Sequence, residues 1–408
     1  MKVKVVDSIM GSGKTSAMIN LINDTCYDEY MMHGERCTNY MYITPYLDEV
    51  ARIKENCKYA YFKEPKSLQG SKINGIKSLL KDGRNIVSTH ALFHLFDDEI
   101  FDLIKTKGYT LIMDEVTDVV EPYTEISKSD LKILLNQGIC HVDDNNYLIW
   151  DQKDYDNGKF FTFKHLCDMN ALQLFGESIV LWMFPIKSFE AFDEIYILTY
   201  MFDGQIQKWY YDFYNCEFTY YKAEKNDKGN YVVVLGTDNR RINSELLNIY
   251  EGKLNDIGER NTSLSDSWYR RAEKNSLLKD LKNNTYNYLK NIAKAKSSLT
   301  LWTVFKDFKN KCKPNSYATC WISLNLRASN EYRERNTCAY LVNRYINPVI
   351  KQFFISKDIP IDENAYALSE MLQWIWRSCI REGKPINLYV PSKRMRTLLI
   401  DWLDGKKI

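Results

Sequence analysis

The stretch Val3-Lys4-Val5-Val6-Asp7-Ser8-Ile9-Met10-Gly11-Ser12-Gly13-Lys14-Thr15-Ser16 decides the fold class. It joins an apolar strand to a glycine-bearing loop that ends in Gly-Lys-Thr at the start of a helix. In such a loop, backbone N–H groups hold the phosphates of a nucleotide, Lys14 reaches the β- and γ-phosphates, and the Thr15 hydroxyl holds Mg²⁺. We therefore expect Gly11, Ser12, Gly13, Lys14, Thr15 and Ser16 to bind a nucleoside triphosphate. Ser8 stands where the usual pattern has its first glycine.

A second signal is the run Tyr109 to Thr117, an apolar strand that ends in two adjacent carboxylates. In an ATPase with this kind of phosphate loop, the first carboxylate, Asp114, holds Mg²⁺ directly or through water. The second, Glu115, orients and activates the attacking water. An Asp-Glu pair also occurs as a mere turn at a strand end, but the phosphate loop upstream favours the catalytic interpretation.

Alternation of strand-like and helix-like patterns predicts a parallel α/β sheet over the first 200 residues. The candidate strands there are Lys2–Val6, Asn39–Thr44, Ala60–Phe62, Asn85–Ser88, Tyr109–Met113, Ile179–Met183 and Glu194–Thr199, and the candidate helices are Thr15–Asn23, Leu47–Asn56 and Lys72–Leu80. The run Asp143–Phe163 predicts an inserted loop or small hairpin. A second α/β unit is expected to contain the strands Leu301–Phe305, Ala318–Ser323, Thr337–Val342 and Ile386–Val390, with helical structure over Tyr269–Lys296 and Lys393–Leu403.

Charge is unevenly distributed along the chain, which has 408 residues and a formal net charge of +2. From Trp268 to Lys313, twelve Lys or Arg residues stand against Glu273, Asp280 and Asp307, a net charge of about +9. The sequence leaves open whether this segment contacts phosphates or is a solvated helical face.

Cysteine spacing and hydropathy exclude several classes of protein. The ten cysteines show no C-x-x-C and no Cys/His cluster at zinc spacing, which predicts reduced thiols and no zinc. The chain begins directly with the strand of the phosphate loop, and no apolar run approaches the roughly 20 residues of a membrane span. We expect a cytoplasmic protein without membrane contact.

At the level of motifs, the chain resembles the superfamily 2 helicases of the DEAD/DEAH-box-like group, especially phage-encoded members. The tetrad Asp114-Glu115-Val116-Thr117 keeps the Asp-Glu of that group and departs from it at the fourth position. The run Tyr42–Tyr46 resembles motif Ia and Ser88–Phe93 resembles motif Ib. This implies that Thr44, Pro45, Ser88 and Thr89 contact a nucleic-acid backbone. The run Ile197–Met201 resembles motif III, which implies that Thr199 couples the ATP site to the nucleic acid.

Two further resemblances fall in the C-terminal part. The run Ser323–Tyr332 resembles motif V and implies that Arg327 contacts nucleic acid. The run Glu370–Arg381 resembles motif VI, and the spacing of Gln373, Arg377 and Arg381 would place all three on one face of a helix. The resemblance implies that this face meets the ATP and that an arginine acts on the γ-phosphate; Arg377 keeps the family spacing from Gln373, while a basic surface helix is the alternative.

The resemblance implies two RecA-like lobes, over residues 1–204 and 267–408, joined by an accessory segment at 205–266. It implies an ATP- and Mg²⁺-dependent helicase or translocase that acts on single-stranded or forked DNA, or on RNA, in phage replication or recombination with replication proteins, in the host cytoplasm. Two alternatives stay open. One is a terminase-like DNA motor, although no nuclease-like set of acidic residues is evident in the C-terminal part. The other is a nucleic-acid-binding switch or loader that uses ATP without unwinding.

Overall fold

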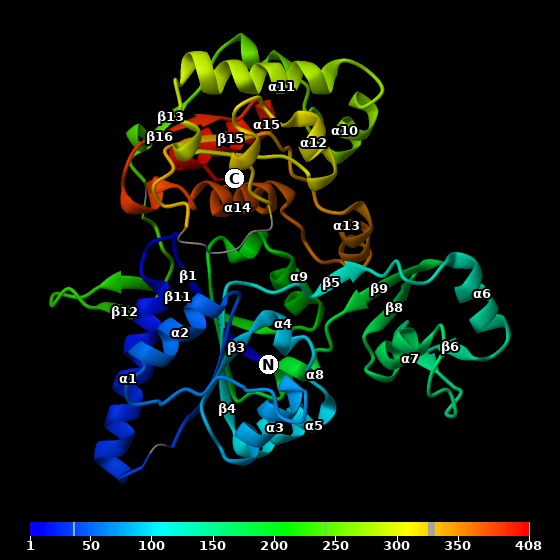
Figure 1. Cartoon of the computed structure of the whole chain (residues 1–408). Coiled ribbons are helices and arrows are strands. Elements are labelled where there is room, and N and C mark those ends of the chain that lie inside the picture. Colours follow the sequence, from blue (N-terminus) through cyan, green and yellow to red (C-terminus); the bar gives the residue numbers. More distant parts are fainter. Residues whose placement is uncertain (36, 241, 325–330, 408) are drawn as a thin grey trace. The chain divides into compact units, whose positions relative to one another are not determined.

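The computed structural model describes residues 1–408 except 36, 241, 325–330 and 408 (Figure 1). The described residues form two compact units. The first consists of Met1–Asp7, Lys14–Gly236 and Asn347–Ile361, and the second of Ser8–Gly13, Thr237–Ile346 and Asp362–Ile408. The predicted accessory segment 205–266 is shared between the units, because residues 205–236 extend the first sheet.

The first unit is built on a seven-stranded sheet with the order β12-β11-β1-β10-β4-β2-β3. Its strands are β1 (Lys2–Asp7), β2 (Asn39–Thr44), β3 (Ile86–Thr89), β4 (Tyr109–Asp114), β10 (Glu194–Thr199), β11 (Glu217–Lys225) and β12 (Tyr231–Leu235). All neighbouring strands are parallel except β11 and β12. The prediction of a parallel α/β sheet is confirmed.

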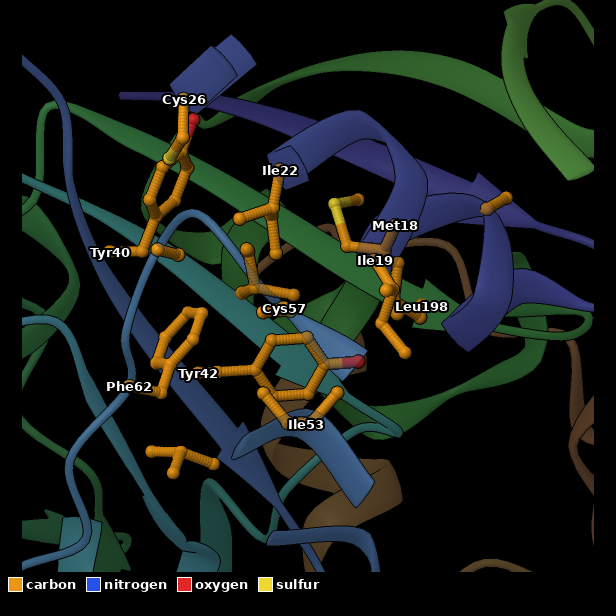
Figure 2. Packing of buried hydrophobic residues seen from close by; sticks show 14 of the residues in the cluster. Met18, Ile19, Ile22, Cys26, Tyr40, Tyr42, Ile53, Cys57, Phe62 and Leu198 are labelled. Atoms are coloured by element: carbon orange, nitrogen blue, oxygen red, sulfur yellow. The ribbon is translucent and has the colours of Figure 1, made fainter. Parts of the chain in front are cut away.

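The first unit also contains helices, most of which flank this sheet. They are α1 (Lys14–His33), α2 (Leu47–Asn56), α3 (Lys72–Lys81), α4 (His90–Phe93), α5 (Asp98–Lys107), α8 (Lys187–Glu190), α9 (Ile206–Phe213) and α13 (Pro348–Ile355), with the 3₁₀ turn η1 (Phe202–Gly204). Figure 2 shows Met18, Ile19 and Ile22 of α1 packed near Tyr42 of β2, in a core that fixes the helix against the sheet. Helix α1 is longer than predicted and begins at Lys14, so the core anchors the start of the helix that carries the phosphate loop.

One strand prediction in the first unit, Ala60–Phe62, is wrong. Tyr61 has a φ of 51°, which is incompatible with extended strand backbone. The side chain of Asn85 donates to the Ala60 carbonyl across 2.6 Å. Ala60 and Phe62 are buried while Tyr61 is exposed, so the alternation that resembled a strand comes from an irregular segment, and among the described residues Lys63 forms an isolated bridge to Ile86.

Residues 120–183 form an insertion between β4 and β10. It contains β5 (Val120–Pro122), α6 (Lys128–Asn136), β6 (Cys140–Val142), β7 (Leu148–Trp150), α7 (Phe161–Asp168), β8 (Leu172–Phe175) and β9 (Ile179–Met183). The loop or small hairpin predicted over Asp143–Phe163 is right in part: the turn and strand β7 of the β6–β7 hairpin lie in this range, whereas β6 precedes it and α7 begins at Phe161. Strand β9 was predicted in the parallel sheet and this is wrong: it pairs antiparallel with β5 and β8 over a separate core.

The second unit contains a four-stranded parallel sheet with the order β13-β16-β15-β14. Its strands are β13 (Leu247–Ile249), β14 (Thr300–Thr303), β15 (Thr337–Tyr340) and β16 (Ile386–Tyr389). Its helices are α10 (Asp266–Ala272), α11 (Leu277–Asn287), α12 (Lys309–Cys312), α14 (Glu363–Ile375) and α15 (Lys393–Leu403), with the π-helix η4 (Tyr288–Ile292) and the 3₁₀ turns η2 (Ser244–Leu246), η3 (Lys253–Gly258), η5 (Ser297–Leu299), η6 (Lys306–Phe308), η7 (Ala318–Cys320) and η8 (Cys379–Glu382).

The predicted strand Ala318–Ser323 is wrong. The backbone N–H of Cys320 donates to the Tyr317 carbonyl at 3.1 Å, which turns the chain into η7. Only Trp321 pairs with Trp302, as an isolated bridge. The buried side chains of Cys320 and Ile322, which resembled a strand in the sequence, pack beside β14 from a turn.

Candidate nucleotide and nucleic-acid site

The loop between β1 and α1 has the backbone that a phosphate loop requires. Gly11 and Gly13 have φ angles of 80° and 86°, in the left-handed region that favours glycine. Lys14 is 8% exposed, and the buried Ser12 hydroxyl has no hydrogen-bond partner among the described residues. A buried hydroxyl without a partner fits a site whose missing acceptor is a phosphate oxygen.

Asp114 lies at the end of β4, where two hydroxyls donate to its Oδ2 atom. The Thr15 Oγ1 atom lies 3.0 Å away and the Tyr42 Oη atom 3.2 Å away. Burial and then the charge of Glu115 raise the pKa of the Asp114 carboxyl to about 6. Burial also raises the pKa of Tyr42 well above its ordinary value, so the phenol keeps its proton and donates it.

This pair of residues fits Mg²⁺ bound with a nucleotide. A hydroxyl and a carboxylate oxygen are hard ligands, and Mg²⁺ in such sites takes its remaining ligands from phosphates and water. No group of three or more His, Cys, Asp or Glu side chains arranged to hold a metal occurs among the described residues. The metal fit therefore depends on the nucleotide.

Glu115 follows with a φ of 65°, an uncommon value for a residue other than glycine. Its N–H donates to the Leu198 carbonyl of β10 at 2.9 Å, and its side chain is half-buried. The left-handed turn directs the chain away from the strand immediately after Asp114. Two adjacent carboxylates thereby have different surroundings, which suits different roles.

The residues around the Asp-Glu turn fix its shape. The His90 Nε2 atom donates to the Asp114 carbonyl at 3.0 Å, which gives His90 a structural role. Thr117, which stands at the position where the helicase group has Asp or His, contacts the His94 ring at 2.7 Å through its hydroxyl. Its N–H donates to the Gln207 side chain at 2.9 Å. Thr117 thus ties the turn to α4 and α9.

Sequence reasoning missed Asp7, the last residue of β1. Its carboxylate accepts the N–H groups of Met201 at 2.8 Å and Phe202 at 2.9 Å, at the turn that follows β10. Burial raises the pKa of Asp7 to about 6, although these hydrogen bonds oppose the rise. An acidic residue that ends an apolar strand directly before the phosphate loop was the available signal.

Strand β10 lies between β1 and β4, and its register pairs Asp7 with Thr199 and Leu198 with Asp114. The Thr199 hydroxyl is buried and hydrogen-bonded to the Gln205 side chain, with 2.9 Å between Thr199 Oγ1 and Gln205 Nε2. Thr199 therefore lies beside the strand ends that carry the phosphate loop and the Asp-Glu pair. Another missed contact joins Arg52 of α2 to the Ser16 hydroxyl at 3.0 Å.

The residues of the first unit that are expected to contact nucleic acid lie together at the ends of the neighbouring strands β2 and β3. Thr44 and Thr89 pair in the β2–β3 register, and Ser88 precedes Thr89. Thr44 is fully buried, with no hydrogen-bond partner for its hydroxyl among the described residues. Pro45 follows β2 directly. Ser88 and Thr89 line a cavity of about 230 Å³ together with residues of α2 and α4. Arg327 lies outside the described residues.

The prediction that Gln373, Arg377 and Arg381 share one helical face is wrong, because α14 ends at Ile375. An uninterrupted helix would join the Ile375 carbonyl to the Cys379 N–H. Instead the Ser378 hydroxyl donates to that carbonyl at 2.7 Å, and the Cys379 N–H donates to Arg335. Arg381 lies in the short turn η8.

The three side chains have different surroundings. Gln373 is half-buried on α14. Arg377 is 6% exposed, and its guanidinium donates to the carbonyls of Ser323 and Leu324 at 3.4 Å. Arg381 is exposed, and within the same compact unit a Cβ atom on Gly11 would lie 3.3 Å from the Arg381 carbonyl oxygen.

Asp238 also contacts the phosphate loop within that unit. Its carboxylate accepts the Ile9 N–H at 3.0 Å and the Arg240 Nε atom at 2.7 Å. Burial disfavours the charged form, but the hydrogen bonds from Arg240 and Ile9 hold the pKa of Asp238 below its ordinary value. Asp238 is therefore an anion that fixes the start of the loop.

Comparisons with known proteins bear on this arrangement. A family model described as the YonV middle domain matches residues 120–182, the insertion between β4 and β10. Another, described as the YonV C-terminal Rossmann-like domain, matches residues 241–403.

No described helix is long and apolar enough to cross a bilayer.

Two solved structures share the fold. The first, described as "Structure of S. tokodaii Xpd4", matches with a TM-score of 0.53 and 11% sequence identity; the match covers 100% of this chain and 94% of that chain. The second, described as "XPD_APO", matches with a TM-score of 0.52 and 12% sequence identity; the match covers 99% of this chain and 95% of that chain. These likenesses show that the fold consists of two RecA-like lobes, each a mostly parallel sheet flanked by helices, as predicted.

The SPbeta prophage-derived uncharacterized protein YonV of Bacillus subtilis (strain 168) is 42% identical to this chain over 422 residues. The alignment covers 100% of both proteins. The chain belongs to the YonV family.

Proposed function

We propose that the protein is a Mg²⁺-dependent ATPase that translocates on nucleic acid, a phage-encoded member of superfamily 2. The observation that carries the proposal is the hydrogen bond between Thr15 and Asp114, which joins the phosphate loop to the Asp-Glu strand end. Asp114 ends a strand of a RecA-like sheet, and Thr15 lies in the first turn of the helix that follows β1. The fold likeness to XPD structures supports a helicase-like motor over other nucleotide-binding enzymes.

The proposed chemistry assigns a role to each residue. Backbone N–H groups of Gly11 to Ser16 and the Lys14 ammonium hold the phosphates, and the Ser12 hydroxyl donates to one of their oxygens. Thr15 and Asp114 would hold Mg²⁺, which would supply charge neutralisation at the phosphate oxygens. Glu115 orients a water molecule in line with the γ-phosphate and accepts its proton.

The proposed nucleic-acid contacts of the first unit, Thr44, Pro45, Ser88 and Thr89, lie at the ends of β2 and β3. We also propose Arg327, which lies outside the described residues, as a contact. Thr199 would couple them to the nucleotide, because β10 lies between β1 and β4. The hydrogen bonds from Met201 and Phe202 to Asp7 would transmit a shift of the phosphate loop to the turn after β10. Gln373 and one of Arg377 and Arg381 complete the proposed ATP site.

The prophage origin of YonV supports action on DNA during phage replication or recombination in the host cytoplasm, with replication proteins as partners. A nucleic-acid-binding switch or loader is the second candidate. It is favoured by the hydrogen bonds that join the phosphate loop to neighbouring residues.

The test is ATP hydrolysis measured without nucleic acid and with single-stranded DNA, duplex DNA or RNA. We expect single-stranded nucleic acid to stimulate turnover and the stimulation to weaken steeply with salt, because phosphate contacts release counterions. If no nucleic acid changes the turnover, translocation is refuted. ATP hydrolysis that persists in that case would leave the enzyme proposal intact.

A further inference from the structure

The second unit has a layer of helices, formed by α10, α11, η4 and α12, that is rich in positive charge. Between Trp268 and Lys313, twelve basic residues stand against three acidic ones, while the whole chain carries only +2. The remainder of the chain is therefore net negative. We infer that four lysines of this layer, Lys279, Lys282, Lys290 and Lys294, form a surface that binds the phosphate backbone of single-stranded nucleic acid. This inference rests on the proposed function.

One face of the helical layer is fixed by the core. Leu278, Leu281, Tyr288 and Leu289 of α11 and η4 are buried in a cluster that includes Trp302 of β14. Helix α11 also contacts α10 and α12, as Figure 1 shows. The layer is thus held rigidly, and a binding surface on it is pre-organised.

The four lysines emerge from the other side of this layer. Lys279, Lys290 and Lys294 are exposed and Lys282 is half-buried. None of the four forms an ion pair with a described residue. We name them the α11 basic surface. Lys279 and Lys282 lie one helical turn apart, a like-charge spacing that destabilises a helix unless an anion offsets it.

Two of the three acidic side chains of the segment pair with basic residues outside the α11 basic surface. Glu273 pairs with Lys311, and Asp307 lies 3.8 Å from Arg270. Asp280 accepts a hydrogen bond from the Ser276 hydroxyl at 3.3 Å. An ordinary solvated helix mixes charges of both signs, so a face of unpaired lysines favours an anionic partner.

The chemistry of the α11 basic surface favours a nucleic-acid backbone over an acidic protein. From Lys279 to Asn287, α11 extends by about 12 Å at 1.5 Å per residue, and η4 continues to Lys290, so the surface is long enough to follow several phosphates. Lysine ammonium groups act as point charges that bind phosphate without reading bases. Asn283, Asn287 and Asn291 lie in the same helical segment; the Asn291 Nδ2 atom donates to the Asn287 Oδ1 atom at 2.7 Å, and the exposed Asn283 amide offers a further donor to phosphate oxygens. Such a contact suits a translocase, which must not depend on sequence.

The experiment compares two variants of the full-length protein. In the test variant, Lys279, Lys282, Lys290 and Lys294 become Gln. In the control variant, four exposed lysines of the first unit, Lys105, Lys107, Lys128 and Lys132, become Gln, which removes the same charge. Thermal unfolding verifies that both variants fold. Fluorescence anisotropy measures binding of a labelled oligo(dT) at several salt concentrations.

We expect the test variant to bind at least about tenfold more weakly than wild type near physiological salt. The slope of log Kd against log salt should fall by about 3, at about 0.7 per lost contact. The control should stay within about threefold. Equal binding by the two variants would overturn the inference and leave the proposed function standing, whereas a wild-type protein that binds no nucleic acid would refute the proposed function itself. Displacement of oligo(dT) by poly-glutamate at equal charge concentration would identify an acidic protein surface instead and overturn the inference.

Discussion

The Thr15 hydroxyl donates a hydrogen bond to the Asp114 carboxylate, with 3.0 Å between the two oxygen atoms. The two residues are 99 positions apart in sequence: Thr15 lies in α1, which follows β1, Asp114 ends β4, and β10 lies between these two strands. This contact brings a phosphate loop and an acidic strand end together, and each of them can be tested separately.

The first prediction concerns Lys14. We expect Lys14→Ala to reduce ATP hydrolysis by roughly 10²-fold or more, because a preorganised charge aimed at the phosphates is lost. The measurement is phosphate release with saturating Mg²⁺. The exposed Lys63→Ala is the control and should hydrolyse ATP as wild type does. Unchanged turnover in folded Lys14→Ala would remove the phosphate-loop assignment.

Glu115 separates a motor from a switch. We expect Glu115→Gln to lower turnover by about 10²- to 10⁴-fold while ATP binding is retained, since the proton acceptor is lost and the metal site is kept. Binding of a fluorescent ATP analogue and phosphate release would measure the two effects. A motor stalls in this variant. If single-strand translocation or loading continued at the wild-type rate with hydrolysis blocked, the switch would be the correct description.

The buried carboxyl of Asp7 predicts a dependence of stability on pH. Its pKa is raised from 3.8 to about 6 in the folded protein, chiefly by burial. The folded state therefore holds the proton more tightly, and this contribution to the free energy of unfolding is complete below about pH 4 and lost as the pH rises through about 6. Relative to Asp7→Asn, the wild type should lose up to about 3 kcal/mol across this window.

Urea unfolding of both proteins at several pH values measures this difference. Asp114 titrates in both proteins, so the difference between them isolates Asp7. Stability curves that stay parallel from pH 4 to pH 7 would show that the Asp7 carboxyl titrates normally.

The two arginines are expected to differ. Arg381 is exposed in η8, so we predict that Arg381→Ala lowers turnover by roughly 10³-fold while ATP affinity stays within about tenfold, as for a group that acts in the transition state. Arg377 is buried against two carbonyl groups. Arg377→Ala should lower the free energy of unfolding by about 1–3 kcal/mol, because those carbonyls lose their donor. A large kinetic defect in Arg377→Ala with unchanged stability would reverse the assignment.

Local patterns predicted the parts of the site that depend on neighbouring residues. The phosphate loop needs left-handed glycines between a strand and a helix, and the quoted stretch contains both. The positions of Asp114 and Thr199 follow because parallel strands end at one edge of a sheet. Helix α15 was predicted with its observed bounds, since the Ser392 cap and the apolar spacing lie within a single segment.

The predictions failed where a side chain, or a residue distant in sequence, forms the hydrogen bond that a backbone group would otherwise form within its own strand or helix. Asn85 satisfies the Ala60 carbonyl and so replaces a strand partner. Ser378 takes the Ile375 carbonyl and Arg335 takes the Cys379 N–H, which ends α14 before Arg377. Asp7 was missed as a site residue because its partners, Met201 and Phe202, lie more than 190 residues away. No periodicity within one segment encodes such contacts.

Helix α13 belongs to the first unit, although the chain on both sides of it belongs to the second. Its Phe353 ring packs on Phe213 at 5.5 Å between centroids, and Phe354 packs on Trp209 at 6.2 Å. During synthesis, the ribosome must therefore have passed residue 361 before the first unit can bury these aromatic side chains. A truncated chain that stops at Gly236 would leave them uncovered, so the N-terminal half should be aggregation-prone when produced alone, even though it contains the whole phosphate loop and the Asp-Glu strand.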